Sequence, residues 1–500
     1  MNDITAFFAF LKYCLGSKED MSTVIAGMNW QELYSFAFKQ AILGLCFDGI
    51  ERLGEEYPEE LRLNPVGREL LMIWMGKSQQ IRRQNMKVNM VASKLYSMFR
   101  EDGLRCCILK GQGNALMYPN AYSRNPGDID VWVNASREEI TEYAKRHFKL
   151  EDDIRFHHLE TTMDGVPVEL HFFPCTMNNP IYHARLQKWF RRNADLQCSN
   201  VVSLPDGVGE MAIPTTAFNV IYQLTHLYHH FFDEGIGMRQ IIDYFLVVND
   251  FSKNVFLNNN FSNPSVSLSK GSSTFSPSPS SSGSGDVTAL CAEFFESPRP
   301  SLAKEGSTSH PSPLSSEERD VTALRCSEPL RYKDGGASKP SPDCLSASAS
   351  KVSPSCAGWD RLDVIGDMAS DVSDSSASAA GSSAYAAFDV VRRELKYLGL
   401  WKFAGAVMYV LHEALGLPEE KMIAPMNEKR GKLLLVEILN GGNFGQHFTK
   451  YGHFTQQGMA KKYFLKIWRN MHFVRYYPAE ALSEPIFRTW HFFWRMKNKK

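Results

Sequence analysis

A short apolar run that carries two aspartates constrains the fold of this chain more than any other feature. The run is Gly127-Asp-Ile-Asp-Val-Trp-Val133. Side chains alternate between the two faces of a β-strand, so Asp128 and Asp130 would emerge on one face and Ile129 and Val131 on the other. Two neighbouring carboxylates repel each other, which is unfavourable unless a cation lies between them. The run therefore predicts a partly buried strand beside a cation site.

A third carboxylate, Glu169, lies in a predicted β-hairpin. The segments 156–163 and 166–173 are both rich in strand-forming residues, and Asp164-Gly165 joins them. Asp-Gly between two such segments is the strongest short-range signal for a hairpin. Together with the two aspartates, the sequence offers three carboxylates on two strands. Oxygen ligands of this kind suit Mg²⁺ or Mn²⁺, which would align a triphosphate for in-line attack.

A predicted strand at 105–109 runs into a glycine-containing turn, Lys110-Gly-Gln-Gly113. A glycine at 111 lets the backbone approach a ligand closely, and the N–H groups that open the next helix would attract phosphate. Arg124 could add a charge-assisted contact. We therefore predict Lys110, Gly111, Gly113 and Arg124 as residues that bind the nucleotide.

Most of the remaining chain has the apolar periodicity of helices. Asn29-Trp-Gln-Glu32 predicts the start of a helix that runs to about Leu53, and a longer helix is expected over 66–100. The fold class is therefore predicted to be α+β, with a small mixed-sheet core embedded in helical regions. The predicted regions are 1–104 (helical), 105–200 (core), 201–251 (helical), 252–386 (insertion) and 387–500 (helical).

Residues 252–386 differ sharply in composition from their surroundings. Serine, proline, glycine and alanine dominate, and two near-identical pieces begin at Pro277 and Pro311. Such a composition cannot bury enough apolar surface to offset the entropy of folding. We predict a disordered insertion.

Composition limits the other possibilities. The 500 residues include 44% hydrophobic residues, enough for a large core, and 55 basic against 55 acidic residues give no general argument for nucleic acid or an anionic membrane. The N-terminus lacks a basic, cleavable signal, and no apolar run reaches the roughly 18 residues of a membrane span. A cytoplasmic protein with no membrane partner is expected, and its ten cysteines, without C-x-x-C spacing, are expected to be buried free thiols. Whether nucleic acid binds is left open.

A set of motifs runs through the chain outside the insertion. They are Ile108-Leu-Lys-Gly111, Tyr118-Pro119, Arg124, Gly127–Val133, Val168-Glu-Leu-His171, His226 with His230, Gly237–Asp243 and Gly441–Gly445. Together they resemble an uncharacterised bacterial branch of the polymerase-β-like nucleotidyltransferase superfamily.

The resemblance implies a metal-dependent transferase that moves a nucleotidyl group from a nucleoside triphosphate to an acceptor. It implies Asp128 and Asp130 as the metal-binding pair and Glu169 as the third acid, all three catalytic, with Gly111 in the nucleotide-binding turn. One position departs from the pattern. The superfamily's usual Gly-Ser after the first strand is Lys110-Gly111 here, so the serine contact to the γ-phosphate is missing.

Four histidines allow several interpretations. His171 shares the face of Glu169 and could contact a ligand, support the carboxylate or lie in the core. His226, His229 and His230 stand at i, i+3 and i+4 and so share one face of a helix. Zinc binding, a contact at the rim of the site and ordinary packing are the alternatives, and no H-E-x-x-H motif favours zinc.

Two further features have a structural and a functional interpretation. Arg239 and Asp243 are spaced i, i+4, which predicts an ion pair within a helix or a substrate contact by Arg239 at the rim. Gly441–Gly445 lacks the Lys-Ser/Thr of a P-loop and the spacing of a dinucleotide-binding fingerprint. It is predicted to be a loop that ends a helix.

The sequence is therefore compatible with three functions. The first is a metal-dependent nucleotidyltransferase whose acceptor is an unknown hydroxyl or phosphate. The second is a non-catalytic module that binds a nucleotide or a protein partner, which the altered glycine turn motivates. The third is an RNA-modifying, toxin-like transferase, against which the absence of a basic stripe counts.

Overall fold

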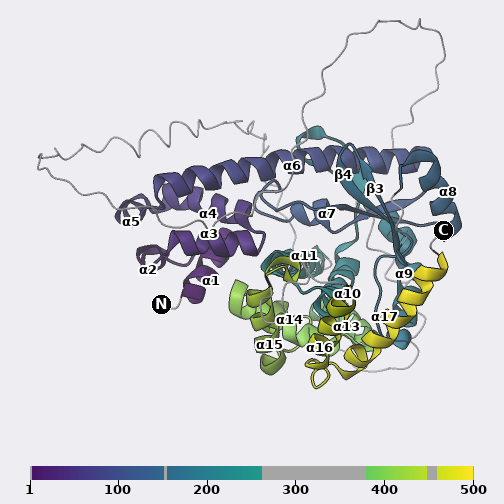
Figure 1. Ribbon diagram of the computed structural model, residues 1–500. Helices are drawn as coiled ribbons and strands as arrows, with labels where there is room; N and C mark the ends of the chain where they lie inside the picture. The colour runs from purple at the N-terminus through teal and green to yellow at the C-terminus, as the bar shows by residue number, and fades with distance from the viewer. Residues whose placement is uncertain (1–2, 151–154, 262–378, 448–458, 499–500) are drawn as a thin grey trace, which may run out of the picture. The chain divides into compact units, whose positions relative to one another are not determined.

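A mixed four-stranded sheet carries the acidic residues that the sequence singled out. In the computed structural model, which describes residues 3–150, 155–261, 379–447 and 459–498, its strands are β1 (Cys106–Leu109), β2 (Ile129–Val133), β3 (His158–Met163) and β4 (Val166–His171). Their order is β1-β2-β4-β3, with β2 antiparallel to β1 and parallel to β4. The predicted α+β class, a small mixed sheet among helices, is confirmed (Figure 1).

The predicted hairpin joins β3 to β4. Asp164 and Gly165 both have left-handed backbone angles, with φ of 51° and 74°. Two central residues of this kind make the turn whose twist matches that of the flanking strands. The hairpin fixes the register of β4, which in turn pairs with β2.

Helices cover both faces of the sheet. On one face, Ile108, Val131 and Leu170 join a core with Val91 and Leu95 of α6 (Arg68–Glu101) and with residues of α8 (Arg137–His147). On the other face, Trp132 packs on Phe190 of α9 (Pro180–Ser199) and stacks on Phe218 of α10 (Thr216–Asp233). Ile129 and Val131 therefore face one core while Asp130 faces α10, as the strand period predicts.

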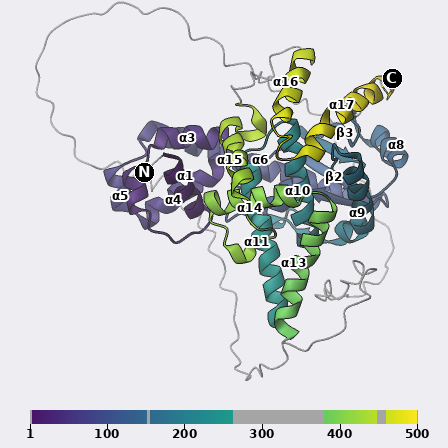
Figure 2. The same cartoon turned by 90° about the horizontal axis from the view of Figure 1, so that it is seen from below.

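The other elements follow in order along the chain, and most of the helices are labelled in Figures 1 and 2. They are α1 (Asp3–Cys14), α2 (Ser22–Ala26), α3 (Trp30–Lys39), α4 (Leu43–Glu56), α5 (Pro58–Leu63), α7 (Gly111–Ala115), β5 (Val201–Ser203), η1 (Pro205–Gly207), β6 (Glu210–Ala212), α11 (Met238–Phe261), α13 (Ala379–Tyr397), α14 (Trp401–Leu415), η3 (Glu419–Lys421), α15 (Glu428–Gly441), η4 (Asn443–Gly445), α16 (Met459–Met471) and α17 (Pro478–Asn498).

One predicted helix is wrong. The helix expected from Asn29 to about Leu53 starts as predicted, with the Asn29 side chain accepting from the Glu32 backbone N–H, but it is broken into α3 and α4. The buried Gln40 lies at the break. Its side chain donates to the Ile438 carbonyl and accepts from the Met238 N–H. These contacts are distant in sequence and override the local helical pattern.

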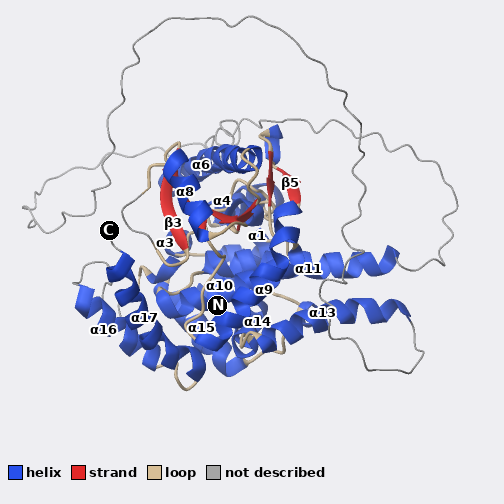
Figure 3. Ribbon diagram, turned by 90° about the vertical axis from the view of Figure 1, so that its right-hand side faces the viewer, coloured by secondary structure: helices blue, strands red, loops and turns tan. Residues whose placement is uncertain are grey.

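The segment predicted to be an insertion is bordered by two helices that lie side by side (Figures 2 and 3). α11 continues to Phe261, beyond the predicted boundary at 252, and α13 begins at Ala379, before 386. The rings of Phe251 and Phe388 pack 5.1 Å apart between them. Residues 262–378, and with them the prediction of disorder, lie outside the described residues.

Two expectations from composition can be compared with the structure. The six cysteines within the described ranges are buried and form no disulfide, as expected. Among the helices in those ranges, none combines the length and the apolarity that crossing a bilayer requires.

Glu480, in the first turn of α17, makes the stability of the protein depend on pH. Its side chain is 1% exposed and accepts the N–H groups of Asn178 and Asn179, just before α9. Burial raises the pKa of Glu480 to about 7. Because the folded-state pKa lies above the unfolded value, its stabilisation is complete below about pH 4.5 and is lost as the pH rises through about 7.

We expect the free energy of unfolding to fall by about 3 kcal/mol more between pH 5 and pH 8 in the wild type than in Glu480→Gln, which cannot titrate. Urea titrations of both proteins across this range measure the difference. Parallel pH profiles for the two proteins would contradict this account of Glu480.

Candidate active site

Two acidic residues from different strands lie side by side on the face of the sheet that α10 covers. Asp130 of β2 and Glu169 of β4 are direct partners in the parallel register. Asp130 is 2% exposed, whereas Glu169 is partly open. Asp128, just before β2, is open to the same pocket. The structure therefore brings the three predicted carboxylates to one pocket beside the central strands β2 and β4.

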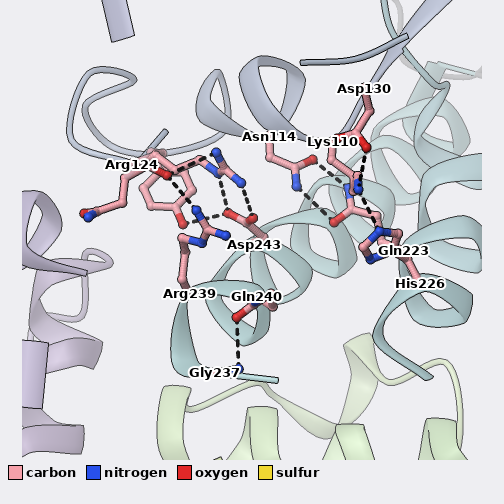
Figure 4. Close-up of polar contacts among 12 residues, drawn as sticks. Lys110, Asn114, Arg124, Asp130, Gln223, His226, Gly237, Arg239, Gln240 and Asp243 are labelled. Carbon is pink, nitrogen blue, oxygen red and sulfur yellow. Dashed lines mark hydrogen bonds and ion pairs between the residues drawn. The ribbon is translucent and has the colours of Figure 1, made fainter. Parts of the chain in front are cut away.

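Lys110, directly after β1, neutralises part of this charge (Figure 4). Its Nζ lies 2.9 Å from Asp130 Oδ1 and 2.6 Å from His226 Nε2 on α10. Lys110 also has a φ of 50°, which is strained for a residue other than glycine. Strain of this kind tends to concentrate at functional sites. The turn thus holds the ammonium group against Asp130 instead of offering the serine hydroxyl of the superfamily pattern.

His171 bridges the two strand carboxylates. Its Nε2 lies 3.0 Å from Asp130 Oδ1 and 3.2 Å from Glu169 Oε2. Of the interpretations that the sequence allowed, support of the carboxylates matches this geometry. Burial alone would lower the pKa of His171, but hydrogen bonds to the two carboxylates raise it to about 9.

The two aspartates differ in their ionisation. Burial would raise the pKa of Asp130, but Lys110 and His171 outweigh burial and hold this pKa well below its usual range. The negative charge of Asp130 then raises the pKa of Asp128 to about 6. Burial would lower the pKa of Lys110, yet Asp130 and Asp128 raise it. Burial keeps the pKa of His226 well below normal, so its neutral ring accepts from the lysine.

Arg124 is held by a buried acid from α11 (Figure 4). Its Nε and Nη2 donate to the two oxygens of Asp243 at 2.9 and 2.8 Å, and the Tyr118 hydroxyl donates to Asp243 as well. Asp243 therefore pairs with Arg124, and the expected pair with Arg239 is wrong. Arg239 instead donates from Nη1 to the Asn125 carbonyl, and its buried Nε has no hydrogen-bond partner among the described residues.

The three histidines of α10 line the same pocket but do not converge on one point. His226 contacts Lys110, His229 Nδ1 lies 3.3 Å from Thr176 Oγ1, and His230 lies beside Glu234. This arrangement matches a rim contact better than a zinc site. Gly113 is not among the residues that line this pocket, and it packs against the Ile213 side chain, 3.2 Å from where a Cβ would lie.

These side chains surround a cavity of about 320 Å³. This volume lies in the range of small-ligand sites. The cavity brings together Lys110, Gly111, Arg124, Asp128, Asp130, Glu169, His171, His226, His230 and Arg239 among the predicted site residues.

Three residues that the sequence did not single out also line the cavity. His157 and His158 enter from the start of β3, and Phe444 enters from the glycine-containing loop after α15. The sequence did contain a signal for His157 and His158, because this adjacent pair opens a predicted strand whose hairpin partner ends in Glu-Leu-His. Phe444 has a φ of 52°, and the Cζ atom of the Arg239 guanidinium lies 5.3 Å from the centroid of the Phe444 ring. Its glycine neighbours indicated only the end of a helix, so this contact was not predictable.

The carboxylates have the chemistry of a divalent-cation site. One oxygen each of Asp130 and Glu169 and one nitrogen of His171 lie within 4.8 Å of one another. Asp128 adds a carboxylate that is open to the cavity. The negative charge of Asp130 raises the pKa of this carboxylate. Oxygen-rich sets of this kind suit Mg²⁺ and Mn²⁺. The residues therefore fit such an ion.

The fold and the cavity define an α+β protein with paired carboxylates on adjacent strands and basic side chains around them. Residues 26–262 of this 500-residue chain match the model of a family described as uncharacterised nucleotidyltransferase. The match confirms the nucleotidyltransferase resemblance. Searches of curated proteins and of solved structures gave no match.

Proposed function

We propose that this protein transfers a nucleotidyl group from a nucleoside triphosphate to a hydroxyl or phosphate acceptor, with the help of Mg²⁺ or Mn²⁺. The observation that carries the proposal is the register of the sheet. It sets Asp130 directly beside Glu169, with Asp128 at the same edge of the cavity. The match of residues 26–262 to a nucleotidyltransferase family model supports nucleotidyl transfer in general.

The three carboxylates would hold the cation. Bound there, the ion would supply positive charge to the phosphate oxygens of the substrate. Asp130 is already ionised by its contacts with Lys110 and His171, so it is ready to bind a cation across the neutral pH range. Asp128, with a pKa of about 6, becomes fully anionic only above neutral pH.

Lys110 and Arg239 would orient the triphosphate. Lys110 brings a cation to the floor of the cavity, next to Gly111. Arg239 lines the cavity with a buried Nε that has no partner among the described residues, and such a donor favours an anionic ligand. Arg124 uses Nε and Nη2 on Asp243, so its role is to position α11 beside the sheet.

A labelling experiment tests the transfer. The protein is incubated with each NTP, labelled at the α- or at the γ-phosphate, with Mg²⁺ or Mn²⁺ and with pools of total RNA, protein extract or small molecules. We expect the α-label to reach one acceptor pool and the γ-label to leave as pyrophosphate.

Two variants serve as comparisons. Glu169→Gln removes a carboxylate of the proposed site and should abolish the transfer. Glu142→Gln removes an exposed acid on α8 and should not change it. Transfer of the γ-label, or equal transfer by wild type and Glu169→Gln, would contradict the proposal.

One observation favours a second candidate, a non-catalytic nucleotide-binding module. Lys110 and His171 both contact the same oxygen of Asp130, so protein cations already neutralise this acid. For such a module the labelling experiment would show no label transfer and no pyrophosphate release in any pool. A separate binding measurement would still show metal-dependent binding of the NTP.

A further inference from the structure

Three histidines form a cluster at the β3 end of the cavity. His158 on β3 and His171 on β4 are direct partners across the antiparallel hairpin, and His157 precedes His158. The His157 ring lies 4.2 Å from the His158 ring and 5.6 Å from the His171 ring, centroid to centroid. One nitrogen of each residue lies within 4.8 Å of the others. Nitrogens that share a tetrahedral ion stand about 3.3 Å apart, so small side-chain rotations would bring these three together.

Each of the two buried histidines has one nitrogen held and one left over. His171 Nε2 lies 3.0 Å from Asp130 Oδ1, and His158 Nε2 lies 3.3 Å from Glu160 Oε1. The Nδ1 atoms of both residues are buried, and neither has a hydrogen-bond partner among the described residues. Both side chains are 3% exposed. A buried polar atom without a partner costs about 1–3 kcal/mol, so two in adjacent side chains call for an explanation.

This arrangement is typical of metal-binding histidines. A histidine that binds a metal through one nitrogen usually donates the other N–H to a carboxylate, which fixes the ring and its tautomer. His158 and His171 each have that carboxylate. Glu169 Oε2 lies 3.1 Å from His158 Nδ1 but without hydrogen-bond geometry, so it does not satisfy this nitrogen.

We propose that His157, His158 and His171 bind a borderline transition-metal ion such as Zn²⁺, at a position distinct from the oxygen-rich site of Asp128, Asp130 and Glu169. Three imidazoles suit Zn²⁺ and are poor ligands for Mg²⁺. The ion fastens the edge strand β3 to β4 and fixes the ring that positions Asp130 and Glu169. The proposal goes beyond nucleotidyl transfer and does not depend on it.

Zn²⁺ binding to the full chain tests the proposal without any nucleotide. Chelator-treated protein is dialysed against Zn²⁺ in millimolar Mg²⁺, and its metal content is measured. We expect one Zn²⁺ per chain, and with Co²⁺ the visible absorption bands of a four-coordinate ion. His157→Ala/His158→Ala should weaken Zn²⁺ binding by about 100-fold.

The matched control is His412→Ala. His412 lies on α14, outside the cavity, with its Nδ1 2.9 Å from the Leu417 carbonyl oxygen, and its loss should leave Zn²⁺ binding unchanged. Circular dichroism checks that the double variant is folded. If it is not folded, the Co²⁺ spectrum of the wild type is the deciding measurement, because a spectrum without the bands of a four-coordinate ion contradicts the proposal. A wild type that retains no Zn²⁺ in the presence of Mg²⁺, or a folded double variant that binds as tightly as the wild type, would overturn the proposal. Because metal content is measured without NTP, failure here is separate from failure of nucleotidyl transfer.

Discussion

Asp130→Asn is expected to lower the rate of nucleotidyl transfer by about a thousand-fold, equivalent to about 4 kcal/mol of transition-state stabilisation. It should also destabilise the fold. Asp130 is buried and compensates the buried His171 and the partly buried Lys110, so its loss leaves both cations with less compensation. Breaking a buried pair in this way costs roughly 3 kcal/mol. The labelling assay measures the first effect and urea unfolding the second.

Asp128→Asn is the matched comparison, because it removes a neighbouring carboxylate of the same cavity. Asp128 is open to solvent, and the charge of Asp130 raises its pKa to about 6. Above that pH its removal relieves repulsion, so at pH 8 we expect lost activity with a gain in stability of about 1 kcal/mol or less, since solvent screens the charge. Equal destabilisation by the two variants, or an Asp130→Asn protein with more than a tenth of wild-type activity, would contradict the assigned roles.

Asp243→Asn is expected to destabilise the protein by roughly 3–5 kcal/mol, because it leaves the buried guanidinium of Arg124 without its counter-charge. The side chains of Arg124 and Asp243 are 6% and 7% exposed, and two parallel hydrogen bonds join them. The pair ties the segment before β2 to α11. The midpoint of urea unfolding measures the loss.

Two further variants check the interpretation of this pair. Asp195→Asn breaks an exposed pair with Arg105, whose side chains are 75% and 52% exposed, and should cost less than about 1 kcal/mol. Arg124→Met/Asp243→Leu replaces both charges by apolar groups and should recover most of the stability. A double variant as unstable as Asp243→Asn would show that the site needs the charges themselves.

The acidic edge of the site was predictable because local rules determine it. The two-residue period of a strand orients Asp128 and Asp130, and Asp164-Gly165 fixes the hairpin that carries Glu169. Helix boundaries were predictable where a cap marks them, as at Ser136, whose side chain accepts from the Glu139 N–H at the start of α8.

The partners of these residues were not predictable, because contacts between distant segments determine them. Lys110 meets His226, and Arg124 meets Asp243, across more than a hundred residues in each case. The i, i+4 spacing favoured Arg239 as the partner of Asp243, but Arg124 offers two parallel bonds in a buried setting and so is preferred. Gln40 breaks a helical pattern for the same reason, through its bonds to α11 and α15.

The central claim is that Asp130 and Glu169 hold a divalent cation in the cavity that binds the triphosphate. Electron paramagnetic resonance of free Mn²⁺ tests it most directly, in titrations of the protein with and without NTP. If the two ligands share the cavity, NTP tightens Mn²⁺ binding, and by linkage Mn²⁺ tightens NTP binding by the same factor. We predict at least a tenfold effect, about 1.4 kcal/mol of coupling, in the wild type and its loss in Glu169→Gln. Mn²⁺ binding that is independent of NTP, or that persists unchanged in Glu169→Gln, would contradict the claim.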